Sequence, residues 1–109
     1  MTLYLMDANI PIRAHGDYYP IDRIAPFWEW LLAQAEAGRI KMPRPIYDEV
    51  ARSPDLLGQW LRRPEVRKAI ILAEANVTPD RNVSYFGEDG DRLHMLFNFW
   101  VNQRLFYAL

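Results

Sequence analysis

The chain opens with a short run of apolar residues that ends at a carboxylate. Residues 3–6 read Leu-Tyr-Leu-Met and are followed directly by Asp7. A short run without alternation is typical of a strand buried on both faces of a mainly parallel sheet. The next stretch, residues 9–20, holds two prolines, a glycine and an aspartate, and this density of breakers predicts a loop that packs back on the molecule.

A helix followed by a second strand is predicted next. Apolar residues recur at i, i+3, i+4 and i+7 from about Pro26, and Gly38 stands where a glycine often ends a helix. The residues of this stripe are Trp28, Leu31, Leu32 and Ala35. Residues 40–42, Ile-Lys-Met, are then predicted to form a second short strand. The order strand, loop, helix, strand predicts an α/β crossover unit with parallel strands.

Two further helices are predicted between residues 45 and 64. In the first, Pro45 occupies an early position, and Glu49 shares a face with apolar neighbours. Ser53 is expected to cap the second, with Pro54 as its first residue and Pro64 at its end. Its apolar stripe contains Leu56, Leu57, Trp60 and Leu61.

The last part of the chain predicts one helix, one strand and a closing helix. An apolar pattern through residues 66–73 indicates the helix, and residues 82–86 alternate with period two as in a strand. Asp91 is placed to cap a long apolar helix that runs to Leu109. Its apolar residues need a sheet, a second subunit in a homodimer or further chain to cover them.

Composition narrows the possible chemistry. The 109 residues include 13 Lys and Arg against 14 Asp and Glu, a net charge of −1, with 50% apolar residues, which fits one domain over residues 1–109. No apolar run is long enough to span a bilayer, and the amino terminus lacks the features of a secretory signal, so we expect a cytoplasmic protein without membrane contact.

The absence of cysteine excludes disulfides, thiol catalysis and thiolate zinc sites. His15 and His94 are in no metal-binding spacing, so any metal must be bound by carboxylates.

Two acids are placed where such a site would form. Asp7 follows the first predicted strand, at the end where open α/β sheets bind ligands, although capping of the next turn is an equal alternative from position alone. Glu49 follows the second strand, and alone it would be read as a solvated helical acid. Carboxylates that converge repel one another and are relieved by a hard cation such as Mg²⁺ or Mn²⁺. Such an ion can position a phosphodiester and activate a water for hydrolysis.

The first half of the chain resembles PIN-like proteins, and more narrowly a bacterial PIN-like family catalogued as a domain of unknown function. The resemblance covers about residues 3–61 and rests on segments that occur in order. They are Leu-Met-Asp-Ala-Asn-Ile at 5–10, Tyr-Tyr-Pro at 18–20, Phe-Trp-Glu-Trp-Leu at 27–31, Gly-Arg-Ile at 38–40, Ile-Tyr-Asp-Glu-Val at 46–50, and Asp-Leu-Leu with Trp at 55–60.

The resemblance implies a three-layer α/β fold with a small, mainly parallel sheet flanked by helices. It also implies a metal-dependent endoribonuclease, with RNA as substrate and Mg²⁺ or Mn²⁺ as cofactor. Asp7 and Glu49 match the first two metal ligands, and Asn9 would support them by hydrogen bonding. Proteins of this kind are commonly toxins of bacterial toxin–antitoxin pairs, so a cognate antitoxin is an expected partner.

The second half departs from the PIN-like pattern. Asp91, with Asp89 beside it, is the candidate third metal ligand and catalytic acid, but a plain helix cap in an acidic turn is the alternative. No acid follows Asp91, so the C-terminal part of the fold is expected to be incomplete. The chain is then either a nuclease, a catalytically inactive scaffold that acts as a protein-interaction module, or a piece of a longer protein.

Weaker candidates lie outside these acids. Arg13, close to Asp7 in the chain, is a possible phosphate contact. The one basic cluster contains Arg62, Arg63, Arg67 and Lys68, and such clusters are most often solvated. Trp28 and Trp60 are expected in the core.

Overall fold

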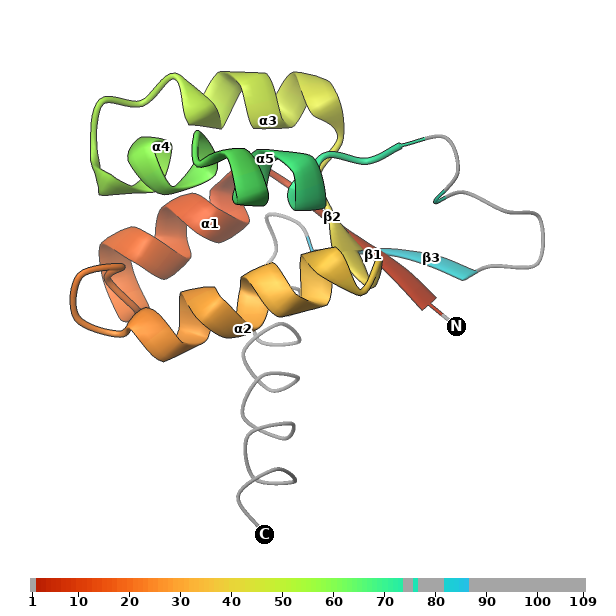
Figure 1. The fold of residues 1–109 in the computed structure, drawn as a ribbon, viewed down its shortest axis with the longest axis horizontal. Helices are drawn as coiled ribbons and strands as arrows, with labels where there is room; N and C mark the ends of the chain where they lie inside the picture. Colours follow the sequence, from red (N-terminus) through yellow and green to blue (C-terminus); the bar gives the residue numbers. More distant parts are fainter. Residues whose placement is uncertain (1, 74–75, 77–81, 87–109) are drawn as a thin grey trace, which may run out of the picture.

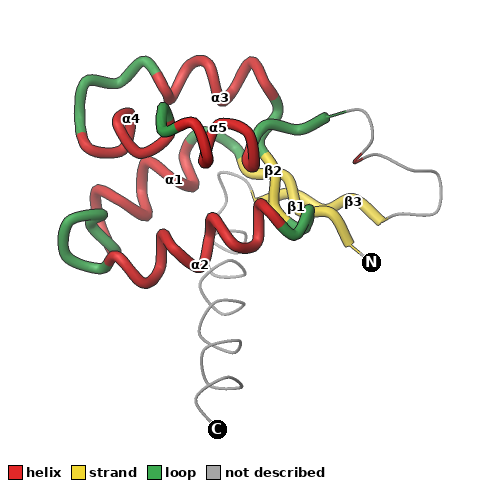
Figure 2. The backbone as a smooth tube through the Cα atoms, viewed as in Figure 1, coloured by secondary structure: helices red, strands yellow, loops and turns green. Residues whose placement is uncertain are grey.

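The chain folds around a small parallel sheet, and helices occupy most of the remaining volume (Figures 1 and 2). The computed structural model describes residues 2–73, 76 and 82–86. The elements are β1 (Thr2–Met6), α1 (Asn9–Arg13), the π-helix η1 (Ala14–Tyr18), α2 (Ala25–Glu36), β2 (Ile40–Lys41), α3 (Arg44–Ala51), α4 (Leu56–Leu61), α5 (Pro64–Ile70) and β3 (Asn82–Phe86).

The sheet has the strand order β2-β1-β3, and both pairs are parallel. Tyr4 of β1 lies opposite Ile40 of β2 and Ser84 of β3, so β1 is the central strand. Leu3, Leu5 and Met6 are buried, as expected for a central strand with an apolar sequence. The predicted α/β class with a parallel sheet flanked by helices is confirmed, and so are the strands at 40–42 and 82–86 in type and position.

Helix α2 ends at the glycine that its sequence predicts. Gly38 adopts a positive φ of 76°, which a residue without a Cβ does at little cost. Its N–H donates to the Ala35 carbonyl at 3.0 Å, and the Arg39 N–H donates to the Gln34 carbonyl at 3.0 Å. This pair of bonds is a Schellman motif, which satisfies the last carbonyls of the helix and turns the chain into β2.

The loop predicted over residues 9–20 is wrong for most of its length, because α1 and η1 occupy residues 9–18. Pro11 lies in the first turn of α1, where a missing N–H breaks no helical hydrogen bond. Ile10 and Ala14, four residues apart, are both buried, so one face of this segment joins the core. Burial of that face outweighs the breakers that the sequence contains.

Two boundaries in the second half also differ from the prediction. The residue that caps α4 is Asp55 and not Ser53, since the Asp55 carboxylate accepts the Gly58 N–H. Helix α5 ends at Ile70, earlier than predicted, because Ile71 pairs with Met42 in an isolated parallel bridge. The buried Lys41 donates its ammonium group to the Ala69 carbonyl near the end of α5, which joins β2 to that helix.

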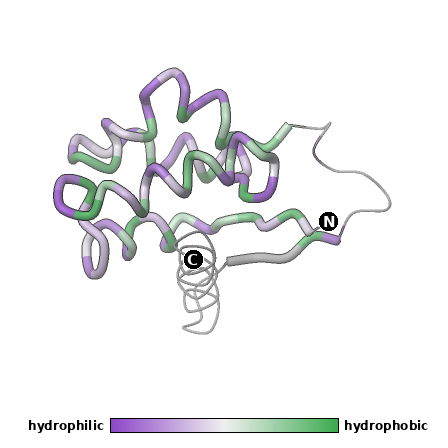
Figure 3. The backbone as a smooth tube through the Cα atoms, turned by 60° about the horizontal axis from the view of Figure 1, so that its bottom comes forward, coloured by the Kyte–Doolittle hydropathy of each residue, from purple (hydrophilic) through white to green (hydrophobic). Residues whose placement is uncertain are grey.

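The core is built on aromatic side chains from helices that are distant in sequence. Trp28 of α2 and Trp60 of α4 are buried, as predicted, with ring centroids 5.0 Å apart in an edge-to-face contact. The Trp28 indole N–H donates to the Tyr19 carbonyl at 2.7 Å, which fixes the segment between η1 and α2 against the core. Figure 3 shows hydrophilic and hydrophobic stretches alternating along the helices, as core-facing helices require.

The closing helix predicted from Asp91 lies outside the described residues, and so do His94 and Asp89. Within the described ranges, no helix combines the length and the apolar character that crossing a bilayer requires.

Candidate functional site

Asp7 lies immediately after the carboxyl end of β1 and is half-buried. Its Oδ1 accepts the Ala8 N–H at 2.8 Å, and its main-chain carbonyl accepts the Ile10 N–H at 3.2 Å. The carboxylate therefore takes part in the turn into α1, as the capping interpretation holds. It also lies at the strand end where the ligand interpretation places it. Because the side-chain contact to the turn uses Oδ1, Oδ2 can bind a ligand.

Glu49 is presented by α3, which begins after Pro43 and carries Pro45 in its first turn. The helix buries Tyr47, Val50 and Ala51. Glu49 itself is exposed, so its carboxylate is less enclosed than the apolar neighbours in the sequence suggested.

Glu49 lines a cavity of about 550 Å³ between the α1–η1 segment and the α3–α4 region. The cavity brings a second carboxylate and an imidazole close to Glu49, which no single sequence motif indicates. Its lining residues are Ile12, His15, Gly16, Glu49, Val50, Arg52, Ser53, Asp55 and Leu57.

His15 is held in place on this wall by main-chain and aromatic contacts. Its Nδ1 accepts the Ile21 N–H at 3.2 Å, and its ring meets the Trp28 ring edge-on at a centroid distance of 6.3 Å. In the neutral imidazole, an accepting Nδ1 leaves the proton on Nε2. His15 is thus half-buried and oriented, although its spacing in the sequence indicated no site.

Asp55 is tied to its own helix. Its Oδ1 accepts the Gly58 N–H at 3.1 Å and the Ser53 hydroxyl at 2.8 Å. The Gly58 amide, and then the Ser53 hydroxyl, hold the pKa of Asp55 below its usual value. Asp55 is therefore an ionised cap at neutral pH.

Replacing Asp55 by Ala is expected to destabilise the fold by about 1 kcal/mol at neutral pH, because α4 loses its cap. Since the folded-state pKa of Asp55 is lowered, this contribution is present above the pKa of the unfolded chain and is lost as the pH falls through the folded-state pKa. Urea unfolding of both proteins should show a stability gap that narrows as the pH is lowered until the Asp55 carboxyl takes up its proton. Asp22→Ala, at an exposed acid before α2, is the matched control. A gap independent of pH would contradict the assignment.

The described residues do not complete the predicted set of three acids. Asp7 is not among the residues that line the cavity at Glu49. Among residues 2–73, 76 and 82–86, no three His, Asp or Glu side chains are grouped closely enough to hold a metal ion. Asp91, the predicted third acid, lies outside the described residues, so the set of Asp7, Glu49 and Asp91 stays a prediction.

The two supporting residues lie on α1. Asn9 is its first residue and is half-buried. The Arg13 Nε is 3.7 Å from Asp17 Oδ2, an exposed ion pair within one turn. A pair of this kind contributes little to stability, so Arg13 can exchange Asp17 for a phosphate at small cost.

Residues 4–83 match the family model described as Domain of unknown function (DUF4411). A segment of 40 residues, 37% of this chain, is 50% identical to part of a trehalose synthase from Thermus thermophilus. The matched segment covers 4% of that protein's length. No solved structure matches the chain.

Proposed function

The chain belongs to the family described as a domain of unknown function (DUF4411), and from its sheet and its acids we propose that it is a metal-dependent endoribonuclease of PIN-like type. In this proposal Asp7 and Glu49 bind Mg²⁺ or Mn²⁺, Asp91 is the third ligand, and RNA is the substrate. The toxin role and the antitoxin partner rest on the PIN-like resemblance described above.

The position of Asp7 directly after the carboxyl end of the central strand is the observation that carries the proposal. β2 lies on one side of β1 and β3 on the other, so the chain leaves β1 toward one edge of the sheet and returns from β2 to the opposite side of β1. In open α/β sheets, the crevice at such a switch point, outside the carboxyl ends of the strands, is where ligands bind. Asp7 is the first residue beyond β1 at this point.

The donor chemistry of these residues fits a hard divalent cation. Carboxylate oxygens are the ligands that Mg²⁺ and Mn²⁺ prefer. In the described part of the chain, the ion pairs of Asp and Glu with Arg or Lys involve Asp17 and Asp48, and neither Asp7 nor Glu49 is neutralised in this way. Two carboxylates without a cationic partner favour a bound cation near them.

In this proposal the side chains around the ion have separate roles. The Ala8 N–H fixes the rotation of the Asp7 carboxylate, so that Oδ2 is the oxygen available for a ligand. Asn9 supports this carboxylate, and Arg13 contacts a phosphate of the substrate. A bound divalent ion supplies charge neutralisation at the phosphate and a water of lowered pKa for hydrolysis.

The test is cleavage of a labelled single-stranded RNA by the purified protein with Mg²⁺, with Mn²⁺ and with EDTA. The proposal predicts internal cleavage with either ion and none with EDTA. An intact RNA under all three conditions would contradict it and would favour the inactive scaffold.

A further inference from the structure

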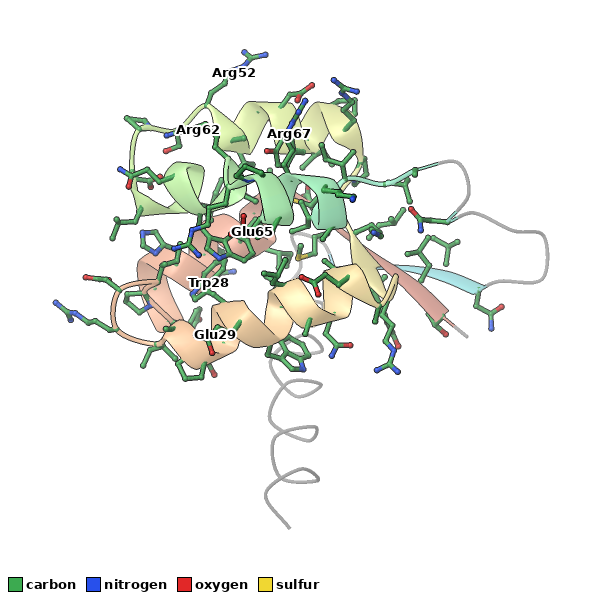
Figure 4. The ribbon with its side chains drawn as sticks, in the orientation of Figure 1. Trp28, Glu29, Arg52, Arg62, Glu65 and Arg67 are labelled. Atoms are coloured by element: carbon green, nitrogen blue, oxygen red, sulfur yellow. The ribbon has the colours of Figure 1, made fainter. Side chains whose placement is uncertain are left out.

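A second cavity, open to solvent and of about 620 Å³, is lined by three arginine side chains, and neither the family match nor the proposed metal site accounts for it. It lies where α3, α4 and α5 meet. Figure 4 shows Arg52, Arg62 and Arg67 on the α3 and α5 side of the molecule. The lining residues are Tyr47, Asp48, Ala51, Arg52, Arg62 and Arg67.

Main-chain carbonyls hold the Arg62 guanidinium in the wall. Its Nη1 donates to the Ala51 carbonyl at 2.5 Å and to the Ser53 carbonyl at 2.9 Å. Arginine has five N–H donors in a rigid fork, and these two bonds use one nitrogen. The guanidinium is thus oriented in advance, with Nε and Nη2 left to bind an anion.

Arg67 lies beside a buried hydroxyl. Tyr47 is buried and donates its hydroxyl to the Leu61 carbonyl at 2.6 Å, and Arg67 lines the same cavity as Tyr47. Burial raises the pKa of Tyr47, although the charge of Arg67 opposes the effect, so the hydroxyl keeps its proton at neutral pH. Arg67 lines the cavity, and no carboxylate of the described residues forms an ion pair with it.

The balance of charge around the cavity is positive. Three arginines face one acid, Asp48, whose Oδ2 lies 3.9 Å from the Nε of Arg44 in an exposed ion pair. Glu65 of α5 is two residues from Arg67, about 200° around the helix. Figure 4 shows Glu65 on the α2 side of α5 and Arg67 on the α3 side. No other carboxylate of the described residues lines this cavity.

Arg52 connects this cavity to the one at Glu49, because it lines both. A ligand that passes Arg52 would therefore contact the cavity at Glu49 on one side of this residue and the arginine-lined cavity on the other. Three guanidinium groups on one surface offer more donors than a single phosphate group needs, so a polymer with repeated phosphates matches them better than a single anion. Planar guanidinium groups bind phosphate oxygens in pairs.

We propose that the cavity of Arg52, Arg62 and Arg67 binds backbone phosphates of single-stranded RNA next to the acid site. This inference rests on the proposed function for the choice of RNA over other polyanions. Binding here does not require a divalent ion, because the arginines supply the charge. The cavity then positions the strand, while the acids lie farther along it.

The test measures binding of a fluorescent single-stranded RNA in EDTA by anisotropy at several salt concentrations. Arg52→Gln combined with Arg67→Gln should weaken binding about tenfold and reduce the slope of log K against log salt by about 1.4, since each lost phosphate contact removes about 0.7. The matched control combines Arg23→Gln with Arg63→Gln, two exposed arginines outside this cavity. The control should change the affinity less than twofold. If the double variant melts early, Arg52→Gln alone is measured, because Arg52 is exposed.

Three outcomes would overturn the inference. They are no RNA binding by the wild type in EDTA, equal losses in the double variant and the control, and displacement of the RNA by poly-glutamate as effective as by unlabelled RNA. The last would assign the cavity to an acidic peptide. Metal binding by Asp7 and Glu49 is measured separately without RNA, so failure of the nuclease proposal and failure of this inference are distinguishable.

Discussion

Replacing Asp7 by Asn is expected to lower the rate of metal-dependent RNA cleavage by about a hundredfold or more, a loss of about 2.7 kcal/mol in transition-state stabilisation. Asn has nearly the same shape, and its Oδ1 can still accept the Ala8 N–H that Asp7 accepts at 2.8 Å. The turn into α1 should therefore survive. What is lost is the negative charge that binds the ion at the end of β1.

The cleavage rate at saturating Mn²⁺ checks this result, with thermal melts to confirm that the variant folds. Glu49→Gln should show a loss in the same direction. Glu29→Gln, at an exposed acid of α2 (Figure 4), is the control and should retain the wild-type rate. Wild-type cleavage by Asp7→Asn would remove Asp7 from the site and leave it as a turn residue.

Replacing Gly58 by Ala is expected to destabilise the fold by about 3 kcal/mol or more. A Cβ at this position would lie 1.8 Å from the Ser53 carbonyl oxygen and 2.9 Å from Arg62 Nη1. The first of these atoms belongs to the main chain, so the α3–α4 connection must shift. The shift would also disturb the 2.9 Å bond from Arg62 to the Ser53 carbonyl. The greater helix propensity of Ala offsets only about 1 kcal/mol.

Urea unfolding measures this effect. Gly16→Ala in η1 is the matched control, because a Cβ there meets no atom within 4 Å, and it should change stability by less than about 1 kcal/mol. Equal stability of Gly58→Ala and the wild type would show that α4 does not approach the Ser53 carbonyl as closely as described.

Local signals in the sequence are sufficient to predict the elements that depend on local chemistry. The apolar run of β1 and the glycine that ends α2 need no distant partner to be recognised, and both are found where they are predicted. Residues 9–18 are different, because their helical form depends on burying Ile10 and Ala14 against other segments. Pro11 and Gly16 would argue against a helix in isolation, and only the tertiary contacts decide the outcome.

In the candidate site, too, local signals predict some features and tertiary contacts decide the others. The position of Asp7 follows from the order of one strand and one turn, which the sequence contains. The residues that share a cavity with Glu49 do not follow from such a local order, since His15 reaches this cavity from a distant segment of the chain. The arginine cavity likewise combines Arg52 with Arg67 across two helices, whereas the sequence suggested only the cluster between residues 62 and 68. Contacts of this kind depend on packing, and no periodicity or motif in the sequence predicts them.

A calorimetric titration of the metal-free protein with Mn²⁺, beside Asp7→Ala and Glu49→Ala, tests the central claim most directly. The proposal predicts saturable binding by the wild type and its loss in either variant, with Glu29→Ala unaffected. Absence of saturable binding by the wild type, or equal binding by all four proteins, would contradict a carboxylate metal site at Asp7 and Glu49.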